Sequence, residues 1–342
     1  MDDTTPSPQR TVLVTDYAWK NLDLERRILA RVGASLVVAQ TGVEDELISL
    51  AAEVDGILTC WKAVTEKVIA NAPHCQAIGR YGIGLDNIDV KFATRMGIVV
   101  TNVPAFCVEE VSDHAMALLL SLARKVVFYD QAIKQEGRYS LRAGAPLYRI
   151  HGKTLGIFGF GKIGRTLYRK AKSFGLRIIT CDPWVDVQSV EGYDVERVSF
   201  QDLLRRSDYL SIHTPLTAET RFLFNREAFR QMKPTAFLIN TARGEIIEGP
   251  ALLEALNRGL IAGAALDVLP KEPPDPTDPL VLHAKAIITP HAAFNSEESL
   301  VELQESAATQ MADALAGKLP SFVVNPEVLT QENLRLRLQR TS

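Results

Sequence analysis

Residues Thr154–Asp182 read TLGIFGFGKIGRTLYRKAKSFGLRIITCD and carry the clearest indication of the fold. A short apolar run, 155–158, is followed by the glycine-rich turn 159–164 and then by apolar residues at helical spacing. A second apolar run, 176–180, ends just before Asp182. This order predicts a strand, a tight turn, a helix and a second strand, which form one unit of a parallel sheet.

The glycines of this turn suit a dinucleotide. Gly159 permits the turn, Gly161 lets the backbone approach a pyrophosphate, and Gly164 allows close packing of helix on strand. The start of the helix that follows offers free N–H groups and a positive dipole end, which attract phosphate. Glycines also mark ordinary turns, but here they lie between a strand and a helix, which favours a cofactor site.

Asp182 indicates which dinucleotide binds. Its carboxylate follows the second strand at close to the expected spacing and would accept hydrogen bonds from ribose hydroxyls. The next residues are Pro183 and Trp184, so no adjacent cation is present to receive a 2′-phosphate. The sequence therefore favours NAD over NADP.

The composition is that of a globular protein with two domains. The chain has 342 residues, 38 basic and 41 acidic side chains, and 46% hydrophobic residues. At about 150 residues per domain, two domains fit. The balanced charge argues against a nucleic-acid or membrane surface as partner, and no apolar run approaches the roughly 18 residues of a membrane span.

Cysteines and the N-terminus suggest a cytoplasmic protein. The four cysteines, Cys60, Cys75, Cys107 and Cys181, show no metal-ligand spacing, so no metal is expected. The N-terminal MDDTTPSPQR is acidic and rich in Pro and Ser, and we expect a disordered lead rather than a signal peptide.

The first third of the chain alternates apolar runs with helical segments, which predicts a parallel sheet covered on both faces. The expected strands are 11–15, 35–39, 56–59, 77–79 and 98–101. Residues 80–87, RYGIGLDN, have Asn where a dinucleotide motif would have Gly. We expect a turn at the end of a strand whose backbone N–H groups face a ligand, with a turn that binds nothing as the alternative.

A long helix is expected over 108–136, followed by an irregular segment, 139–150, with several apolar residues. Apolar residues outside the regular pattern suggest burial against another chain. We therefore expect a homodimer in which this segment is buried against the second chain.

The second half of the chain reads as a doubly wound domain, with its ligand beyond the carboxyl ends of the strands. Expected helices are 200–206, 226–232 and 250–258, and expected strands are 209–212, 236–240, 264–268 and 286–289. A further helix over 297–316 and an extended segment, 321–325, are expected to return to the first unit. The basic tail, 331–342, receives no function.

Three strand ends carry polar groups that suit one chemistry. Arg243 follows one strand, Asp267 ends the next with Glu272 five residues on, and His291 follows the last. Hydride transfer to a carbonyl needs a proton donor and a cation, and a carboxylate can orient the imidazole. Arg243 would bind a substrate carboxylate through two hydrogen bonds, His291 would be the acid, and Glu272 would orient it.

Other residues near these strand ends are assigned to the cofactor. His213 and Thr214 are expected near its phosphates or ribose, and Asp267 near the nicotinamide carboxamide. Four histidines adjoin no strand end of this half and are not assigned to the site: His74, His114, His151 and His283. Singly, each of the three catalytic candidates has a structural explanation, such as a surface ion pair or a loop residue. No Ser or Cys nucleophile motif is present.

These motifs resemble the D-isomer-specific 2-hydroxyacid dehydrogenases. The matching segments are GFGKIG with Asp182, NTARGEIIEGPALLEAL, GAALDVLPKEPP and ITPHAAFNSEES. The resemblance implies a flavodoxin-like substrate domain, 1–102 plus 296–328, and a Rossmann NAD-binding domain, 103–295, with a cleft between them. The arm 103–150 would form the dimer, and 329–342 would be a tail.

The resemblance also implies site residues. The catalytic set is Arg243, Glu272 and His291, and the chain would interconvert a 2-oxo acid and a D-2-hydroxy acid. Substrate contacts would include Tyr81, Gly82 and Ile83. Cofactor contacts would be Gly159, Gly161, Lys162, Ile163, Gly164, Asp182, His213, Thr214, Thr241, Ala242, Arg243, Asp267, His291 and Ala293.

Two alternatives are open within the family. Several motifs are similar to the C-terminal binding protein branch, whose animal members are NAD-sensing corepressors, but Phe294 stands where that branch has Trp. Phosphoglycerate dehydrogenases have an Arg where this chain has Thr59 or Cys60, although Lys62 or Arg80 could substitute for it.

Overall fold

The computed structural model describes residues 10–183 and 192–338. Trp184 and most of the N-terminal lead lie outside the described residues. The chain divides into two compact units, residues 1–106 with 296–342 and residues 107–295. The first division falls after residue 106, whereas the sequence suggested residue 102.

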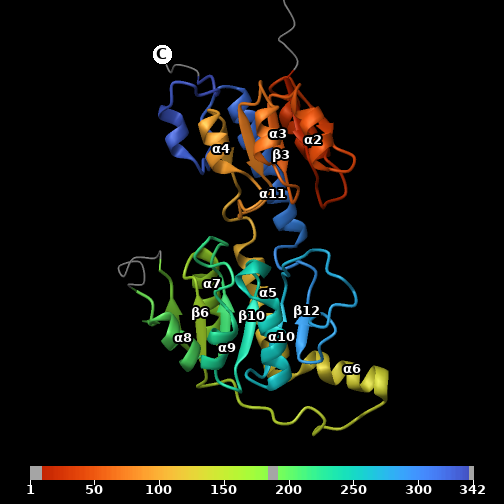
Figure 1. Ribbon diagram of the computed structural model, residues 1–342, viewed down its shortest axis with the longest axis vertical. Coiled ribbons are helices and arrows are strands. Elements are labelled where there is room, and N and C mark those ends of the chain that lie inside the picture. Colours follow the sequence, from red (N-terminus) through yellow and green to blue (C-terminus); the bar gives the residue numbers. More distant parts are fainter. Residues whose placement is uncertain (1–9, 184–191, 339–342) are drawn as a thin grey trace, which may run out of the picture. The chain divides into compact units, whose positions relative to one another are not determined.

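The first unit is a five-stranded parallel sheet in the order β2-β1-β3-β4-β5, which is the flavodoxin-like order. Its strands are β1 Arg10–Val14, β2 Ala34–Val38, β3 Gly56–Thr59, β4 Ala77–Arg80 and β5 Val99–Thr101. Its helices are α1 Asp23–Ala30, α2 Glu44–Ala51, α3 Glu66–Ala70, α4 Val90–Arg95 and α11 Glu297–Leu315, with the 3-10 turn η3 Pro326–Thr330. Helices α2 to α4 share one core with the strands, and α11 packs with α1 on the other face (Figure 1).

The second unit is a seven-stranded parallel sheet in the order β12-β11-β10-β9-β6-β7-β8. Its strands are β6 Thr154–Phe158, β7 Arg177–Cys181, β8 Glu196–Arg197, β9 Tyr209–Ile212, β10 Phe237–Asn240, β11 Gly263–Leu266 and β12 Ala286–Ile288. Its helices are α5 Val108–Arg124, α6 Val126–Glu136, α7 Lys162–Lys172, α8 Phe200–Arg206, α9 Arg226–Gln231 and α10 Gly249–Arg258, with the 3-10 turn η2 Gly244–Ile246. This is the Rossmann order with one added strand, so two parallel-sheet α/β domains are confirmed.

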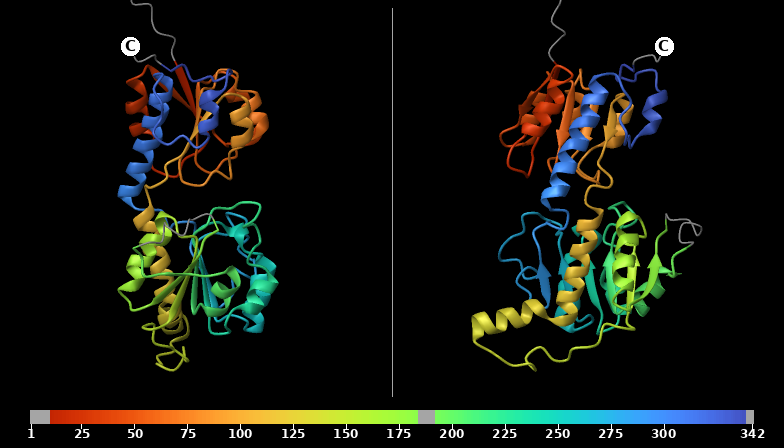
Figure 2. Two further views of the ribbon diagram at one scale, coloured as in Figure 1. Left: turned by 90° about the vertical axis from the view of Figure 1, so that its left-hand side faces the viewer. Right: turned by 180° about the vertical axis from the view of Figure 1, so that it is seen from behind.

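Each face of the second sheet has its own core. Helices α5 and α7 cover one face, where Leu119 and Leu167 pack on Leu155 and Ile157 of β6. Helices α8, α9 and α10 cover the other, with Leu203, Phe229 and Leu252 fully buried. Figure 2 shows the sheet between these two helical layers. Both faces of the sheet are therefore buried under helices, and ligands can bind only at the edge where the strands end.

The expected helix over 108–136 is wrong, because two helices occupy this range. Lys125 separates α5 from α6 and adopts the left-handed conformation, with φ 53° and ψ 38°. Helix α6 and residues 137–150 extend away from the rest of the second unit (Figures 1 and 2). Among the described residues, no helix is long and apolar enough to cross a membrane.

Residues 329–338 are part of the first unit, although the sequence suggested a separate tail. The Arg335 guanidinium donates to the carbonyl oxygens of Ala72 at 2.7 Å and Pro73 at 3.2 Å. The backbone N–H of Arg335 donates to the carbonyl oxygen of Gly97 at 2.8 Å, and Leu336 is 3% exposed. The segment is thus held by backbone carbonyls near α3 and α4, which no local sequence pattern indicates.

Candidate active site

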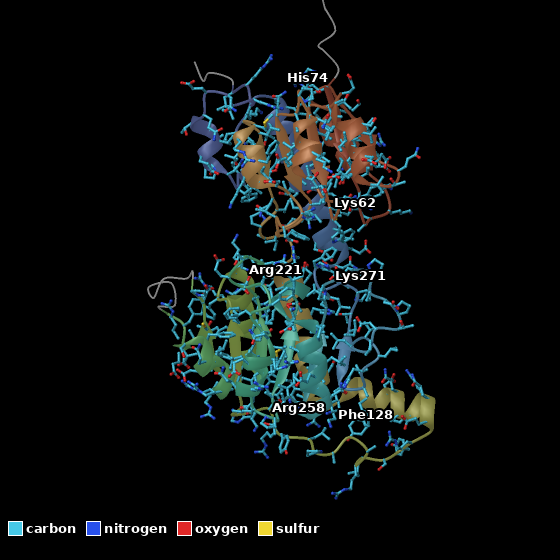
Figure 3. All side chains as sticks on the ribbon, viewed as in Figure 1. Lys62, His74, Phe128, Arg221, Arg258 and Lys271 are labelled. Carbon is cyan, nitrogen blue, oxygen red and sulfur yellow. The ribbon has the colours of Figure 1, made fainter. Side chains whose placement is uncertain are left out.

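The carboxyl ends of the parallel strands meet at one edge of the second unit. Figure 3 marks this edge by Arg221 and Lys271, while Arg258 at the end of α10 lies at the opposite edge. The loops that leave this edge follow β6, β7, β9, β10, β11 and β12. These loops carry the residues that the sequence assigns to the cofactor and to catalysis.

The turn between β6 and α7 needs its glycines for different reasons. Gly159 has φ 98°, and a side chain there would collide with the backbone of His213. A side chain at Gly164 would collide with the carbonyl oxygen of Gly159, so this glycine allows the helix to approach the turn. A Cβ on Gly161, in contrast, would meet nothing within 4 Å. The open space at Gly161 lies in front of the helix start, where an anion is best stabilised.

The start of α7 presents unused donors. Within the described residues, the backbone N–H groups of Gly161, Lys162 and Ile163 have no acceptor. Asp182 is 7% exposed, and its carboxylate accepts the Phe160 N–H at 2.6 Å. Asp182 thus holds the glycine turn from the end of β7.

Two hydroxyl groups fit the same cofactor. The Oγ1 atoms of Thr214 and Thr241 are buried and have no hydrogen-bond partner within the described part of the chain. A buried hydroxyl without a partner is costly, and a ligand that supplies the partner removes this cost. The unused donors, the open space at Gly161 and these two hydroxyls therefore fit NAD.

His213 is neutral near pH 7. Burial lowers the pKa of its imidazole to about 4. Its ring Nε2 lies 2.8 Å from Ser211 Oγ, and its backbone N–H donates to the Phe158 carbonyl oxygen at 2.7 Å. His213 can therefore offer the cofactor hydrogen bonds but no positive charge.

Glu272 and His291 lie in direct contact. His291 Nδ1 is 2.6 Å from Glu272 Oε2, and Glu272 Oε1 accepts the Leu269 N–H at 2.8 Å. Because an ionised carboxylate only accepts, Nδ1 carries a proton and the other ring nitrogen, Nε2, is left for a substrate. The backbone bond from Leu269 fixes the carboxylate, and the carboxylate in turn fixes the ring.

Asp267 holds the turn that carries His291. Its Oδ1 and Oδ2 accept the N–H groups of Ala292 and Ala293, each at 2.9 Å, and its carbonyl oxygen accepts the His291 N–H at 2.7 Å. The Asp267 side chain is 1% exposed. Both carboxylate oxygens are thus used by the turn, and the contact of Asp267 with a nicotinamide carboxamide stays a prediction.

Arg243 lies in a turn that Asn240 stabilises. The Asn240 side chain donates to the Arg243 carbonyl oxygen at 2.8 Å and accepts the Ala242 N–H at 3.0 Å. The Arg243 guanidinium donates to the Ala242 carbonyl oxygen at 2.8 Å and is half-buried. The next residue, Gly244, lies against the backbone of Leu269 and Pro270, where any side chain would collide. The turn of Arg243 is therefore packed against the segment that anchors Glu272.

The first unit presents its own donors after β4. Within the described ranges, the N–H groups of Ile83 and Gly84 have no acceptor. Arg80 is 7% exposed and donates to the carbonyl oxygens of Gly84 and Tyr81, which shapes this loop. The Tyr81 ring is 2% exposed and meets Trp19 edge-on at 4.8 Å. The Tyr81 backbone N–H donates to the Thr59 carbonyl oxygen at 2.8 Å, so neither the ring nor this N–H is free for a substrate. A substrate contact of Tyr81 stays a prediction.

Three residues that support these loops are not indicated by the sequence: His114, Asn240 and Thr289. His114 lies on a helix and adjoins no strand end, but its Nε2 is 3.0 Å from Thr289 Oγ1. Thr289 Oγ1 in turn lies 2.5 Å from Asp267 Oδ1. No local signal could have found these contacts, since His114 and Thr289 are far apart in sequence. Among the described residues, no group of three His, Cys, Asp or Glu side chains could hold a metal ion.

Comparison with known proteins agrees with this architecture. Residues 116–293 match the model of the D-isomer specific 2-hydroxyacid dehydrogenase NAD binding domain. A glyoxylate reductase of Korarchaeum cryptofilum is 40% identical over 270 residues, which are 78% of this chain and 81% of the relative. A D-3-phosphoglycerate dehydrogenase of Methanocaldococcus jannaschii is 37% identical over 94% of this chain and 61% of its own length.

Solved structures give the same result. A glyoxylate reductase from Paecilomyes thermophila has a TM-score of 0.84 at 26% identity and covers 94% of this chain and 100% of its own. A D-lactate dehydrogenase from Aquifex aeolicus, complexed with NAD and lactic acid, has a TM-score of 0.82 at 26% identity and covers 90% and 96%. The chain therefore belongs to the D-isomer-specific 2-hydroxyacid dehydrogenase family of NAD-dependent oxidoreductases.

Proposed function

We propose that this chain reduces a small 2-oxo acid to the D-2-hydroxy acid, and catalyses the reverse oxidation. Bound NADH supplies the hydride. For reduction the His291 ring must carry a second proton, on Nε2, in addition to the one on Nδ1. Nε2 gives this proton to the carbonyl oxygen on which negative charge develops, the ring is left neutral, and Glu272 keeps the imidazole oriented. Arg243 binds the substrate carboxylate, and the free N–H groups of Ile83 and Gly84 are further candidates for that carboxylate.

The observation that carries this proposal is the contact of 2.6 Å between His291 Nδ1 and Glu272 Oε2. A surface histidine needs no carboxylate that is itself anchored by a backbone N–H. A general acid does, because the ring must present one nitrogen to the substrate in a fixed direction. The half-buried Arg243 in the neighbouring loop supplies the cation that a carboxylate substrate requires.

We propose glyoxylate as the first substrate to test, because several relatives at 37–40% identity are named glyoxylate reductases. A phosphorylated substrate is less well supported. Arg80, one of two residues suggested for a phosphate, is buried and donates to the carbonyl oxygens of its own loop. The other residue suggested for a phosphate is Lys62, which lies at the edge of the first unit in Figure 3.

We further propose that the second unit binds NAD, that the first unit contributes to substrate binding, and that the molecule is a homodimer. Exposed apolar side chains on α6 and on 137–150 support the dimer: Val126, Ile133, Tyr139, Leu141 and Tyr148. An NAD-sensing corepressor role is the alternative of another class. It predicts NADH binding without turnover.

The decisive experiment is a panel of 2-oxo acids with purified protein and NADH: glyoxylate, pyruvate, hydroxypyruvate, phenylpyruvate, 2-oxoglutarate and 3-phosphohydroxypyruvate. We expect NADH oxidation with at least one unphosphorylated acid. His291→Ala should lower kcat by about 10²–10⁴-fold, as loss of a general acid does, with NADH affinity nearly intact. His283→Ala, in a loop outside this site, is the matched control. NADH binding without oxidation of any acid would favour the corepressor-like alternative.

A further inference from the structure

His114 lies on α5 but contacts the base of the turn that carries His291. Its Nε2 is 3.0 Å from Thr289 Oγ1 and 3.5 Å from Asp267 Oδ1. The His114 side chain is 25% exposed, and the Asp267 side chain is 1% exposed. A buried carboxylate therefore has an imidazole as its neighbour, and neither group takes part in the proposed proton transfer.

The hydroxyl of Thr289 fixes the direction of these hydrogen bonds. Thr289 Oγ1 lies 2.5 Å from Asp267 Oδ1, and a hydroxyl has one proton to give. Because the carboxylate only accepts, that proton goes to Asp267. Thr289 must then accept from His114, which requires the proton of His114 to be on Nε2. The order of donation is therefore from His114 to Thr289 to Asp267.

Asp267 in turn holds the backbone of the turn that carries His291. The N–H groups of His291, Ala292 and Ala293 all donate to Asp267, at 2.7, 2.9 and 2.9 Å. His291 has φ 53°, a left-handed conformation that is unfavourable for a residue other than glycine. Such a conformation persists only where its surroundings enforce it. The three bonds to Asp267 enforce it, together with a second acceptor of the His291 backbone N–H, the Thr289 carbonyl oxygen at 3.0 Å.

We propose that His114 is a positioning residue, which acts through Thr289 and Asp267 to hold the turn of His291. This inference rests on the proposed acid role of His291 for its kinetic consequence. Without the donor on His114, the Thr289 hydroxyl can turn away from Asp267, and the buried carboxylate loses a partner. The turn then relaxes, and His291 spends less time in the geometry that proton transfer requires. A displacement of about 1 Å at such a group can lower the rate about 10²-fold.

The test compares His114→Leu with His114→Gln, whose side-chain amide can restore a donor. We expect His114→Leu to lower kcat about 10–100-fold, with KM and NADH affinity within about twofold of the parent. His114→Gln should recover most of kcat. Ser112→Ala is the control on the same helix, because Ser112 is fully buried and accepts from Lys170 Nζ at 2.7 Å without contact to the turn. It should leave kcat unchanged.

Two further measurements separate this inference from the proposed function. Hydrogen exchange at His291, Ala292 and Ala293 should become faster in His114→Leu and not in Ser112→Ala, whether or not any substrate is turned over. Thr289→Val combined with His114→Leu should be no worse in kcat than the more damaging single variant, since both break one chain of contacts. Parent-like kcat or exchange in His114→Leu, or additive losses in the double variant, would overturn the inference. A parent that turns over no 2-oxo acid would instead reject the proposed function.

Discussion

At the scale of single residues, Arg243 is the simplest test of substrate binding. A guanidinium that forms two hydrogen bonds with a carboxylate loses both in Arg243→Ala, and each such charged bond contributes about 1.5–3 kcal/mol. The KM for the 2-oxo acid should therefore rise about 10²–10⁴-fold, measured by initial rates at saturating NADH. The KM of Arg243→Lys should lie between those of the parent and of Arg243→Ala, because lysine keeps the charge but not the forked geometry. An unchanged KM would remove Arg243 from the substrate carboxylate.

Much of the site at this scale could be predicted because parallel strands end at one edge of a sheet. That rule alone brings Glu272 and His291 to the same place, and they lie 2.6 Å apart. It could not reveal His114, whose partner Thr289 is brought close only by the packing of α5 on the sheet. It also could not show that Tyr81 turns its ring into the core, since a buried aromatic leaves no pattern in a loop.

At the scale of elements, Gly244 links two loops. It begins η2, and a Cβ there would collide with the backbone of Leu269 and Pro270. Because the collision is with backbone, Gly244→Ala must displace one segment, at a cost of about 1–3 kcal/mol. Since Leu269 also anchors Glu272, kcat should fall together with Tm, as measured by thermal denaturation and steady-state kinetics.

Gly249 is the matched control for this substitution. It begins α10, and a Cβ there would meet nothing within 4 Å. Gly249→Ala should therefore leave Tm the same or slightly higher, because alanine restricts the unfolded chain more than glycine does. A Gly244→Ala protein with the Tm and kcat of the parent would show that the two loops do not depend on each other.

The elements that could not be predicted are those without a local pattern. The break between α5 and α6 lies at Lys125, where a sequence argument would look for glycine. Strand β8 has two residues, which is too short for any alternation to be seen. The segment held by Arg335 depends on carbonyl groups of residues far away in sequence. Regular elements with a clear apolar period, such as α8, α11 and β9, could be predicted to within a residue or so.

At the scale of the whole molecule, the arm formed by α6 and residues 137–150 predicts the oligomeric state. Tyr139 is 90% exposed and Leu141 is 86% exposed, although both are apolar. The Tyr129 hydroxyl donates to the Leu141 carbonyl oxygen at 2.7 Å, so the arm has a defined conformation. Large apolar side chains that an ordered segment exposes to water are typical of a surface that is covered by a partner chain.

Light scattering at micromolar concentration should therefore give twice the chain mass of 37.7 kDa. Replacing both Tyr139 and Leu141 by Ser should shift the mass toward the monomer, because the apolar area that drives association is removed. Leu282→Ser is the matched control, since Leu282 is 68% exposed but lies in another loop, and it should leave the dimer intact. A monomeric parent would reject the dimer outright. A double variant that stays dimeric would place the interface on a surface other than this arm.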